Sequence, residues 1–312
     1  MSSTVTSGVS GQVTAMSRLR TSITDVLLVA MALIWGVNVS VMKLAVVQMP
    51  PLVFNVARLG LASLALVVLA FGVRRVALSR RDVAVLLALG VLGTGLYQFF
   101  MIEGLARTRA GTTALILASG PAFVALFGRV LGVERITRRG MFGIALSVAG
   151  IGLVALTQPD SFARRTSLLG SLLVLIGCIC WSLFTVLLKP YANRLDGRLI
   201  TAITIVGGTV PLSLLALPEL NAVAWEQLSM GVWGAIVYSG LASMVIAYLF
   251  WNRGVRLLGP TRTSMFGNLQ PVFALAAAGV MLGEKPGVWQ LVGAVGIIVG
   301  VVLTRTAEPR PD

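Results

Sequence analysis

The chain has 312 residues, of which 57% are hydrophobic and 12% are charged, and its mean hydropathy is +0.93. A water-soluble protein has about 25% charged residues, so this chain has too little polar surface to be covered by water. Its 25 basic and 11 acidic residues give a formal net charge of +14, which in a soluble protein would indicate nucleic-acid binding. In a membrane protein, an excess of basic residues in the loops determines which way the chain is oriented in the bilayer. We therefore expect an integral membrane protein surrounded by lipid, with no nucleic-acid partner.

Histidine is absent, and the two cysteines are Cys178 and Cys180. A spacing of two places them on different sides of a helix, and no other soft metal ligand is available. We therefore expect no metal site and no cofactor. Zinc hydrolases, enzymes with histidine acid–base chemistry and disulfide scaffolds are excluded on the same grounds.

Ten apolar segments, separated by charged residues, Pro and Gly, each come close to the roughly 20 residues that a helix needs to cross a bilayer. The connections between them are short, which leaves no room for a soluble domain. The sequence therefore predicts an all-α integral membrane protein with ten transmembrane helices. The predicted spans are residues 25–46, 52–72, 83–103, 111–131, 140–157, 168–188, 199–217, 230–251, 263–282 and 287–304.

Basic residues are distributed unequally between the two ends of these spans. With the N-terminus in the cytoplasm, 17 of the 25 basic residues lie on the cytoplasmic side. Three lie within or at the ends of spans, namely Lys43, Arg58 and Arg129. Five lie on the other side, namely Arg107, Arg109, Arg164, Arg165 and Lys285. Because Lys and Arg are enriched in cytoplasmic loops, we predict that both termini are cytoplasmic.

The second part of the chain repeats the first. Trp35 and Lys43 match Trp181 and Lys189 at an offset of 146 residues, and later positions match at an offset of 150 without a gap across three spans. In the first repeat, the residues that are identical to the residue 150 positions later are Gly90, Phe100, Gly104, Thr113, Pro121, Phe123, Val130, Glu134, Gly143, Gly150 and Leu153. Each repeat has five spans, an odd number, so the second is inverted in the membrane, as is typical of secondary transporters.

The repeats divide the chain into five parts. Residues 1–24 are rich in Ser and Thr and hold no apolar run, so we expect a disordered cytoplasmic tail. The other parts are a first five-helix repeat over 25–157, a linker over 158–167, an inverted repeat over 168–304 and a cytoplasmic tail over 305–312.

Each repeat has a Trp in its first helix, a central Pro in its fourth, and a Glu closing that fourth helix. The closing sequences are Leu282-Gly283-Glu284-Lys285 and Gly132-Val133-Glu134-Arg135. In these motifs, over residues 25–304, the chain resembles the EamA-type branch of the drug/metabolite transporter superfamily, although Val133 stands where that pattern favours Gly. It is most similar to the bacterial aromatic amino-acid exporters. The resemblance implies an inner-membrane exporter of amino acids and other small metabolites.

Aromatic and polar residues near the middle of the spans are candidates for a substrate site. Trp35 and Trp181 both lie near mid-span, whereas Trp usually lies at the membrane interfaces. We expect these indoles to line a central cavity, where they offer apolar contact and cation–π attraction to an ammonium group. The alternative is that the two indoles pack between helices. Asn38 lies one turn from Trp35 on the same helix face.

Pro121 and Pro271 lie centrally in their spans. A Pro frees a backbone carbonyl, which a substrate or a cavity water can satisfy, so we expect these two residues to act as hinges in cavity walls; plain kinks are the alternative. Polar side chains in hydrocarbon need partners and should face the bundle interior. The complete predicted substrate site is Trp35, Asn38, Arg58, Tyr97, Gln98, Ser119, Trp181, Tyr248, Asn268 and Gln270.

Arg58 is either a partner for a substrate carboxylate or a side chain that pairs with a neighbour or snorkels outward. No predicted span has a carboxylate in its middle, and Glu103 lies close to an outer end. Because proton-coupled carriers need a buried titratable group, we favour facilitated export of neutral or aromatic amino acids by alternating access. The alternative is proton-coupled multidrug efflux, since an aromatic cavity also fits lipophilic drugs. An integral membrane enzyme is disfavoured.

Small residues lie on one face of the fifth and tenth spans, including the GxxxG motif from Gly296 to Gly300. Small residues allow close approach of helix backbones. We expect these two helices to form a scaffold, possibly against each other. Such a stripe also dimerises helices, so the expected state is a monomer or a homodimer.

Overall fold

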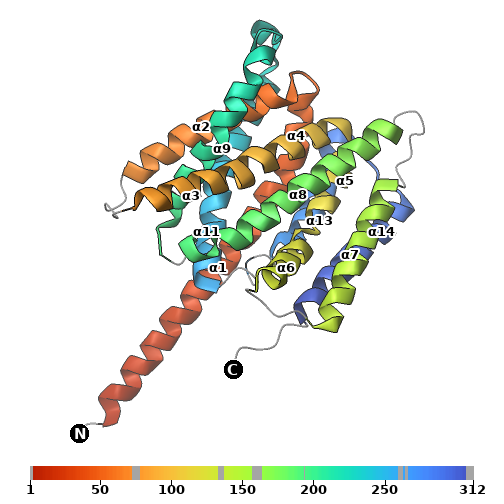
Figure 1. Ribbon diagram of the computed structural model, residues 1–312. Coiled ribbons are helices and arrows are strands. Elements are labelled where there is room, and N and C mark those ends of the chain that lie inside the picture. The colour runs from red at the N-terminus through yellow and green to blue at the C-terminus, as the bar shows by residue number, and fades with distance from the viewer. Residues whose placement is uncertain are drawn as a thin grey trace.

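The computed structural model describes residues 3–71, 78–132, 137–156, 164–192, 194–258, 263 and 266–306, and every regular element in these ranges is a helix (Figure 1). The first half contains α1 Ser3–Val46, α2 Pro51–Phe71, α3 Arg80–Gly90, the π-helical segment η1 Val91–Leu96, α4 Tyr97–Arg107, α5 Ala110–Leu117, α6 Gly120–Val130 and α7 Arg138–Leu156. The second half contains α8 Arg164–Ala192, α9 Gly197–Leu220, the 3-10 turn η2 Trp225–Gln227, α10 Met230–Val237, the π-helical segment η3 Tyr238–Ile246, α11 Ala247–Leu258, the 3-10 turn η4 Gly267–Leu269, α13 Gln270–Leu282 and α14 Val288–Thr306.

Seven stretches of the described chain are helical, long and apolar enough to cross a bilayer. They are Ile23–Val46, Pro51–Ala70, Arg80–Arg107, Ala110–Val130, Leu168–Ala192, Gly197–Leu220 and Met230–Leu258. Two shorter apolar helices, Gln270–Leu282 and Val288–Gly300, complete the set. The prediction of an all-helical multi-pass membrane protein is therefore confirmed.

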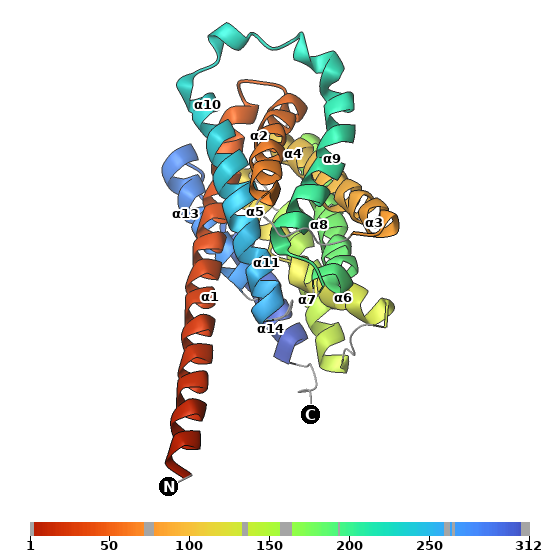
Figure 2. The same ribbon diagram turned by 90° about the vertical axis from the view of Figure 1, so that its left-hand side faces the viewer.

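The N-terminal helix differs from the prediction. We expected residues 1–24 to be a disordered tail, but α1 begins at Ser3 and continues without a break into the first apolar stretch. No Pro interrupts residues 3–46, and extending an existing helix adds one hydrogen bond for each residue that becomes ordered. The first turns of α1 therefore project from the bundle as a continuation of the span (Figures 1 and 2).

Helices of the two halves interleave. In the inner layer α1 packs on α11 and α13, α2 packs on α9, and α4 packs on α8, so each of these contacts joins one half to the other. The start of α1 and the end of α14 lie at the same end of the molecule (Figures 1 and 2). A chain whose described ends lie on one side of the bundle crosses it an even number of times.

The two central prolines begin helices. The fourth predicted span is divided between α5 and α6, and Pro121 lies in the first turn of α6. Pro271 lies in the first turn of α13, directly after η4. Pro lacks a backbone N–H and is tolerated in a first turn, where that N–H would have no partner in the helix. Both spans are thus broken just before the proline.

The stripe of small residues joins α7 to α14. Ser147 Oγ donates a hydrogen bond to the carbonyl of Ile297 over 3.2 Å. A methyl group built on Gly150 would meet the Gly293 carbonyl oxygen at 2.7 Å, and one on Gly300 would collide with Gly143 and Ser147. The residue numbers of these contacts rise along one helix and fall along the other, so the helices are antiparallel. The expected packing of these two helices against each other is therefore present.

This contact gives a stability prediction. We expect Gly150→Ala to lower the free energy of unfolding by about 1–3 kcal/mol, because the added methyl group forces the α7 and α14 backbones apart. Gly152→Ala is the matched control, since nothing lies within 4 Å of the added methyl group on the same helix. Alanine there should leave stability unchanged or raise it by up to about 1 kcal/mol. Thermal unfolding in detergent measures both; equal midpoints for the two variants would contradict the close contact.

Candidate functional site

A narrow central cavity, of about 70 Å³ and partly open to solvent, lies between helices of both halves. Small-molecule sites usually have about 300–1,000 Å³, so the surrounding helices must move apart before this cavity can hold a metabolite. The lining residues are Trp35, Asn38, Val39, Met42, Tyr97, Gln98, Met101, Leu117, Cys178, Trp181, Ser243, Met244, Tyr248 and Gln270. Every residue in this set comes from a helix or π-helical segment, so the walls are regular secondary structure.

Aromatic rings form one wall of this cavity. The Trp35 and Trp181 rings are perpendicular, with centroids 6.3 Å apart, and each lies within 6 Å of the Tyr248 ring. Tyr97 lies 5.2 Å from Trp181. The Trp251 ring is not part of the lining, but it lies 5.7 Å from Trp35 and packs against it. Edge-to-face contacts of this kind hold the rings in fixed orientations, so their faces are preorganised for a ligand.

The π-helical segment η3 positions Trp35. The Trp35 Nε1 donates a hydrogen bond to the backbone carbonyl of Ser243, a residue of η3, over 3.1 Å. A π-helical turn shifts the backbone hydrogen bonds out of the α-helical pattern, so a backbone carbonyl can accept from a donor outside the helix. The indole N–H is thereby satisfied within the protein. Trp35 consequently presents only its ring to the cavity.

Gln98 is oriented by the buried Arg58. The Arg58 Nη2 donates to Gln98 Oε1 over 2.5 Å, and Nε donates to Asn55 Oδ1 over 2.9 Å. Guanidinium nitrogens can only donate, so the Gln98 oxygen must face Arg58. The Gln98 amide nitrogen then points to the other side, where it lies 3.6 Å from Met244 Sδ, a weak acceptor. Because a thioether is a weak acceptor, the Gln98 amide nitrogen can exchange this contact for a stronger acceptor in the cavity that Gln98 lines.

Asn38 is oriented in the same sense. Ser239 Oγ donates to Asn38 Oδ1 over 2.5 Å, which leaves the amide nitrogen of Asn38 toward the cavity. The buried Ser243 Oγ and Arg58 Nη1 have no hydrogen-bond partner among the described residues. Two of the three amides that line the cavity, Asn38 and Gln98, thus have their oxygens occupied by other protein groups. The amide nitrogens of these two residues are the donors that remain for a ligand.

Seven predicted site residues line this cavity. They are Trp35, Asn38, Tyr97, Gln98, Trp181, Tyr248 and Gln270. Arg58 is fully buried behind Gln98 and makes no part of the lining, so it acts on the cavity through that amide. Ser119 is also fully buried, and its hydroxyl donates to the Ile116 carbonyl over 2.6 Å instead of facing the cavity. The backbone of Asn268 belongs to η4, and its side chain lies outside the described part of the structure.

Three residues in or next to the cavity lining were not predicted: Ser243 is part of the lining, whereas Trp251 contacts Trp35 and Asn55 accepts a hydrogen bond from Arg58. Trp251 follows Tyr248 by three residues and so shares its helix face, a signal that was present in the sequence. Asn55 bears the same relation to Arg58. Ser243 carried no such signal, because its position depends on the π-helical segment η3.

A second polar arrangement closes one end of the bundle. Lys43 Nζ donates to the carbonyls of Leu105, Ala106 and Thr108 over 2.7–3.2 Å, at the end of α4. The carboxylate of Glu284 accepts from the backbone N–H groups of Ala110 and Gly111, each over 3.0 Å, at the start of α5. We call Lys43, Glu284 and the chain between α4 and α5 the polar clamp. Glu284 belongs to the second half and α5 to the first, so the clamp ties the halves together.

Residues 22–156 and 168–306 each match the EamA-like transporter family. The chain belongs to the EamA-like transporter family. Its two matching segments together contain every residue of the central cavity and of the polar clamp. The resemblance drawn from the Trp, Pro and Glu motifs is therefore confirmed.

Relatives of this EamA-family chain are transporters by name. It is 28% identical to "Uncharacterized transporter YyaM" of Bacillus subtilis over 89% of this chain and 92% of the relative. It is 30% identical to the "Probable terminal-alkyne amino-acid exporter" of Streptantibioticus cattleyicolor, over 80% and 82%. It is 24% identical to the "Probable amino-acid metabolite efflux pump" of Salmonella typhimurium, over 86% and 90%. These names describe transporters and no enzyme.

The fold also matches a solved crystal structure. The TM-score is 0.62, at 18% sequence identity, and the match covers 91% of this chain and 97% of the other. At this identity the likeness concerns the fold alone. It extends over nearly the whole of both chains.

Proposed function

We propose that this transporter exports small amino acids with neutral or aromatic side chains through the central cavity. The observation that carries the proposal is that the amides of Gln98 and Asn38, whose oxygens are already occupied, line the same cavity as the rings of Trp35 and Trp181. A substrate carboxylate accepts hydrogen bonds from the two amides, and the indole faces receive the side chain or the ammonium group. Two of the relatives carry amino-acid export in their names, which supports the same substrate class.

The charge of Arg58 argues against cationic cargo. It is fully buried, and both of its hydrogen-bond partners, Asn55 and Gln98, are neutral. A buried positive charge is costly unless a negative group compensates it. The substrate carboxylate supplies that group, whereas a lipophilic cation would meet repulsion. Multidrug efflux of cations is therefore the less favoured alternative.

The transport cycle that we propose is alternating access between ten transmembrane helices in two inverted repeats. Three observations support the repeats: the antiparallel contact of α7 with α14, the π-helical segments η1 and η3 at matching places, and two separate family matches. The repeats are residues 25–157 and 168–304, joined by the linker 158–167. We place the protein in the bacterial inner membrane with both termini in the cytoplasm, following the distribution of basic residues.

Facilitated export remains our choice over proton antiport. Glu103, the acidic residue nearest to a span centre, forms an ion pair with Arg107 one helical turn away. The Arg107 side chain is 37% exposed, so this pair lies near the bundle surface and away from the cavity. Glu103 is not among the residues that line the central cavity, so a substrate in that cavity does not contact its carboxylate.

Counterflow in proteoliposomes tests the function with three matched compounds. L-phenylalanine has both charged groups, phenethylamine lacks the carboxylate, and 3-phenylpropionate lacks the ammonium. We expect rapid counterflow of phenylalanine, slower counterflow of phenylpropionate and none of phenethylamine. Counterflow of phenethylamine at the rate of phenylalanine would refute the carboxylate site and favour cationic drugs.

The aromatic wall has its own test. We expect Trp35→Ala combined with Trp181→Ala to lower phenylalanine counterflow at least about 100-fold, because two stacking surfaces of the site are lost. Trp225→Ala combined with Trp233→Ala is the matched control: these rings also contact each other, at 6.2 Å, but they lie outside the cavity. The control should retain the wild-type rate. Unchanged transport in the first variant would remove the cavity from the pathway.

A further inference from the structure

A second cavity, of about 280 Å³, lies where α8 ends and α9 begins, beside the last turns of α11. One wall is apolar and is made by Ala192, Ile200 and Leu249. The rest is polar or charged and is made by Asp196, Gly197, Arg198, Asn252, Arg253 and Arg256. This composition is unlike that of the central cavity, where none of the described lining residues is charged.

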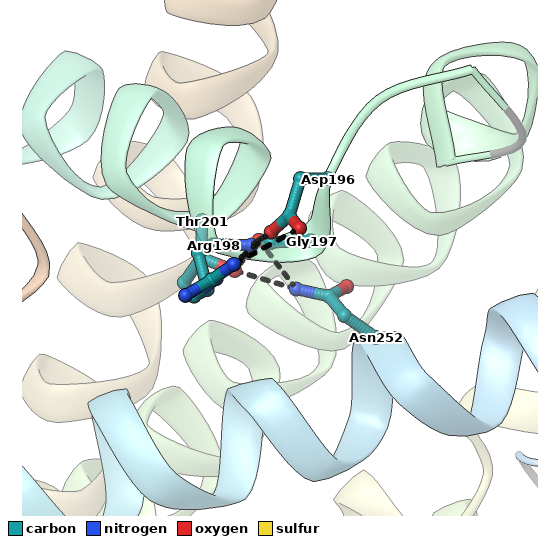
Figure 3. A network of polar contacts seen from close by, with 5 residues as sticks. All are labelled: Asp196, Gly197, Arg198, Thr201 and Asn252. Carbon is teal, nitrogen blue, oxygen red and sulfur yellow. Dashed lines mark hydrogen bonds and ion pairs between the residues drawn. The ribbon is translucent and has the colours of Figure 1, made fainter. Parts of the chain in front are cut away.

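Asn252 joins α11 to the first turn of α9 (Figure 3). Its Nδ2 donates to Thr201 Oγ1 over 2.5 Å and lies 3.4 Å from the Gly197 carbonyl oxygen. Thr201 Oγ1 in turn donates to the same carbonyl over 2.6 Å. These bonds hold the two helices at a fixed separation beside the cavity. The charged side chains lie nearer to the helix ends.

The one acidic residue of this cavity is already paired. Asp196 accepts from the Arg198 backbone N–H over 2.8 Å and from its Nε over 3.2 Å, as Figure 3 shows. Burial by itself raises the pKa of Asp196, but the hydrogen bonds from Arg198 and the charges of Arg198 and Arg256 outweigh it and hold that pKa below its usual value. Asp196 is therefore ionised at neutral pH, and its direct ion pair is with Arg198.

Two arginines of α11 remain without an acidic partner. Arg253 and Arg256 are three residues apart and so share a helix face. Arg253 Nε donates to the neutral Thr24 Oγ1 over 3.3 Å. Within the described part of the chain neither arginine forms an ion pair. The cavity lining therefore combines two guanidinium groups that form no ion pair with a described residue and three apolar side chains, those of Ala192, Ile200 and Leu249.

We propose that this cavity binds the headgroup phosphate of an anionic phospholipid, with Arg253 and Arg256 on the phosphate and an acyl chain along Leu249 and Ile200. Guanidinium groups bind phosphate oxygens through paired hydrogen bonds. The site lies at the span ends that the basic residues assign to the cytoplasm, where the leaflet is rich in anionic lipids. A free phosphate would use the arginines but not the apolar wall, which is why we assign the site to a lipid.

Lipid binding in this cavity would make the stability of the protein depend on the lipid composition of the membrane. The lipid would contact α8, α9 and α11 together and so stabilise the arrangement that Asn252 already holds. We expect phosphatidylglycerol added to the protein in dodecyl maltoside to raise the midpoint of thermal unfolding by several degrees more than phosphatidylcholine does. Inorganic phosphate at the same concentration should produce no such shift.

Two double variants distinguish lipid binding in this cavity from nonspecific attraction of anionic lipid to a basic protein. Arg253→Gln combined with Arg256→Gln should weaken phosphatidylglycerol binding at least about tenfold, read from the lipid concentration that gives half of the shift. Arg80→Gln combined with Arg81→Gln is the matched control, because it removes two charges from the same predicted membrane face outside the cavity. The control should keep the wild-type response.

The single variant Arg256→Gln should fold normally, because the Arg256 side chain is exposed. It should weaken phosphatidylglycerol binding about threefold or more. Three results would overturn the proposal: equal shifts with phosphatidylcholine, an equal shift with inorganic phosphate, or equal losses in the cavity and control variants. The second of these would identify a site for soluble anions.

Discussion

Gln98→Glu is expected to reverse the charge preference of the transporter, lowering phenylalanine counterflow at least about 100-fold and permitting that of phenethylamine. Arg58 orients this side chain, so glutamate would keep the contact with the guanidinium through one oxygen. Its other oxygen would replace the amide nitrogen that now faces the cavity. The wall would then present an acceptor and a negative charge where the substrate carboxylate binds. Charge-assisted hydrogen bonds are worth about 1.5–3 kcal/mol each, and the loss of one is compounded by repulsion.

The same experiment includes a second substitution and a control. Gln98→Leu removes the donor without adding charge, so it should lower phenylalanine counterflow about 10- to 100-fold without admitting phenethylamine. It also leaves Arg58 Nη2 without an acceptor, so its thermal midpoint is measured alongside. Gln227→Glu, in η2 and outside the cavity, adds the same charge elsewhere and should leave the selectivity unchanged. Wild-type selectivity in Gln98→Glu would show that this side chain does not contact the cargo.

The spans were predictable because hydropathy is a property of local sequence. The predicted span 140–157 lies within two residues of α7, and 287–304 within two residues of α14. The predicted ends were less accurate where a helix continues beyond its apolar stretch. α1 begins at Ser3 because no residue stops it, and α11 continues to Leu258, beyond the predicted end at residue 251. Breaks at the central prolines were expected, since the missing N–H is a property of the residue itself.

The site was predictable in its residues and not in its chemistry. Trp35, Asn38 and Gln98 were identified as polar or aromatic residues within apolar spans, Gln98 toward the outer end of its span, and hydropathy alone reveals such residues. Whether an amide turns its oxygen or its nitrogen to a cavity depends on partners distant in sequence, as with Ser239, which is 201 residues from Asn38. The placement of Arg58 behind Gln98 likewise follows from the packing of α2 against α4. The donors that remain for a ligand therefore appear only in three dimensions.

The polar clamp connects this site to transport. Lys43 holds the end of α4, and Glu284 holds the start of α5 from the other half of the chain. Both lie at the bundle end predicted to face outward, above a cavity that is lined by Met42, one residue before Lys43. Opening the cavity on that side requires the halves to part, which breaks the Glu284 hydrogen bonds to α5 and separates Glu284 from the positive charge of Lys43, whose own hydrogen bonds stay within the first half. The clamp thus favours the state that is closed to the outside.

Lys43→Met and Glu284→Gln are expected to open the cavity more often to the outside. Cys178 lines the cavity and is nearly fully buried, which makes it a native reporter once Cys180→Ser has removed the second thiol. A membrane-impermeant maleimide added outside should label Cys178 at least about tenfold faster in either variant. Loss of about 1.5–3 kcal/mol from the closed state raises the open population by that factor or more.

Arg107→Gln is the control for this measurement, because its ion pair with Glu103 lies at the same end of the bundle but joins residues of a single helix. It breaks no contact between the halves, so labelling should proceed at the wild-type rate. Added phenylalanine should protect Cys178 in all variants if the thiol and the substrate share the cavity. Wild-type labelling rates in both clamp variants would mean that the halves part elsewhere, whereas faster labelling without protection would separate the clamp from the substrate site.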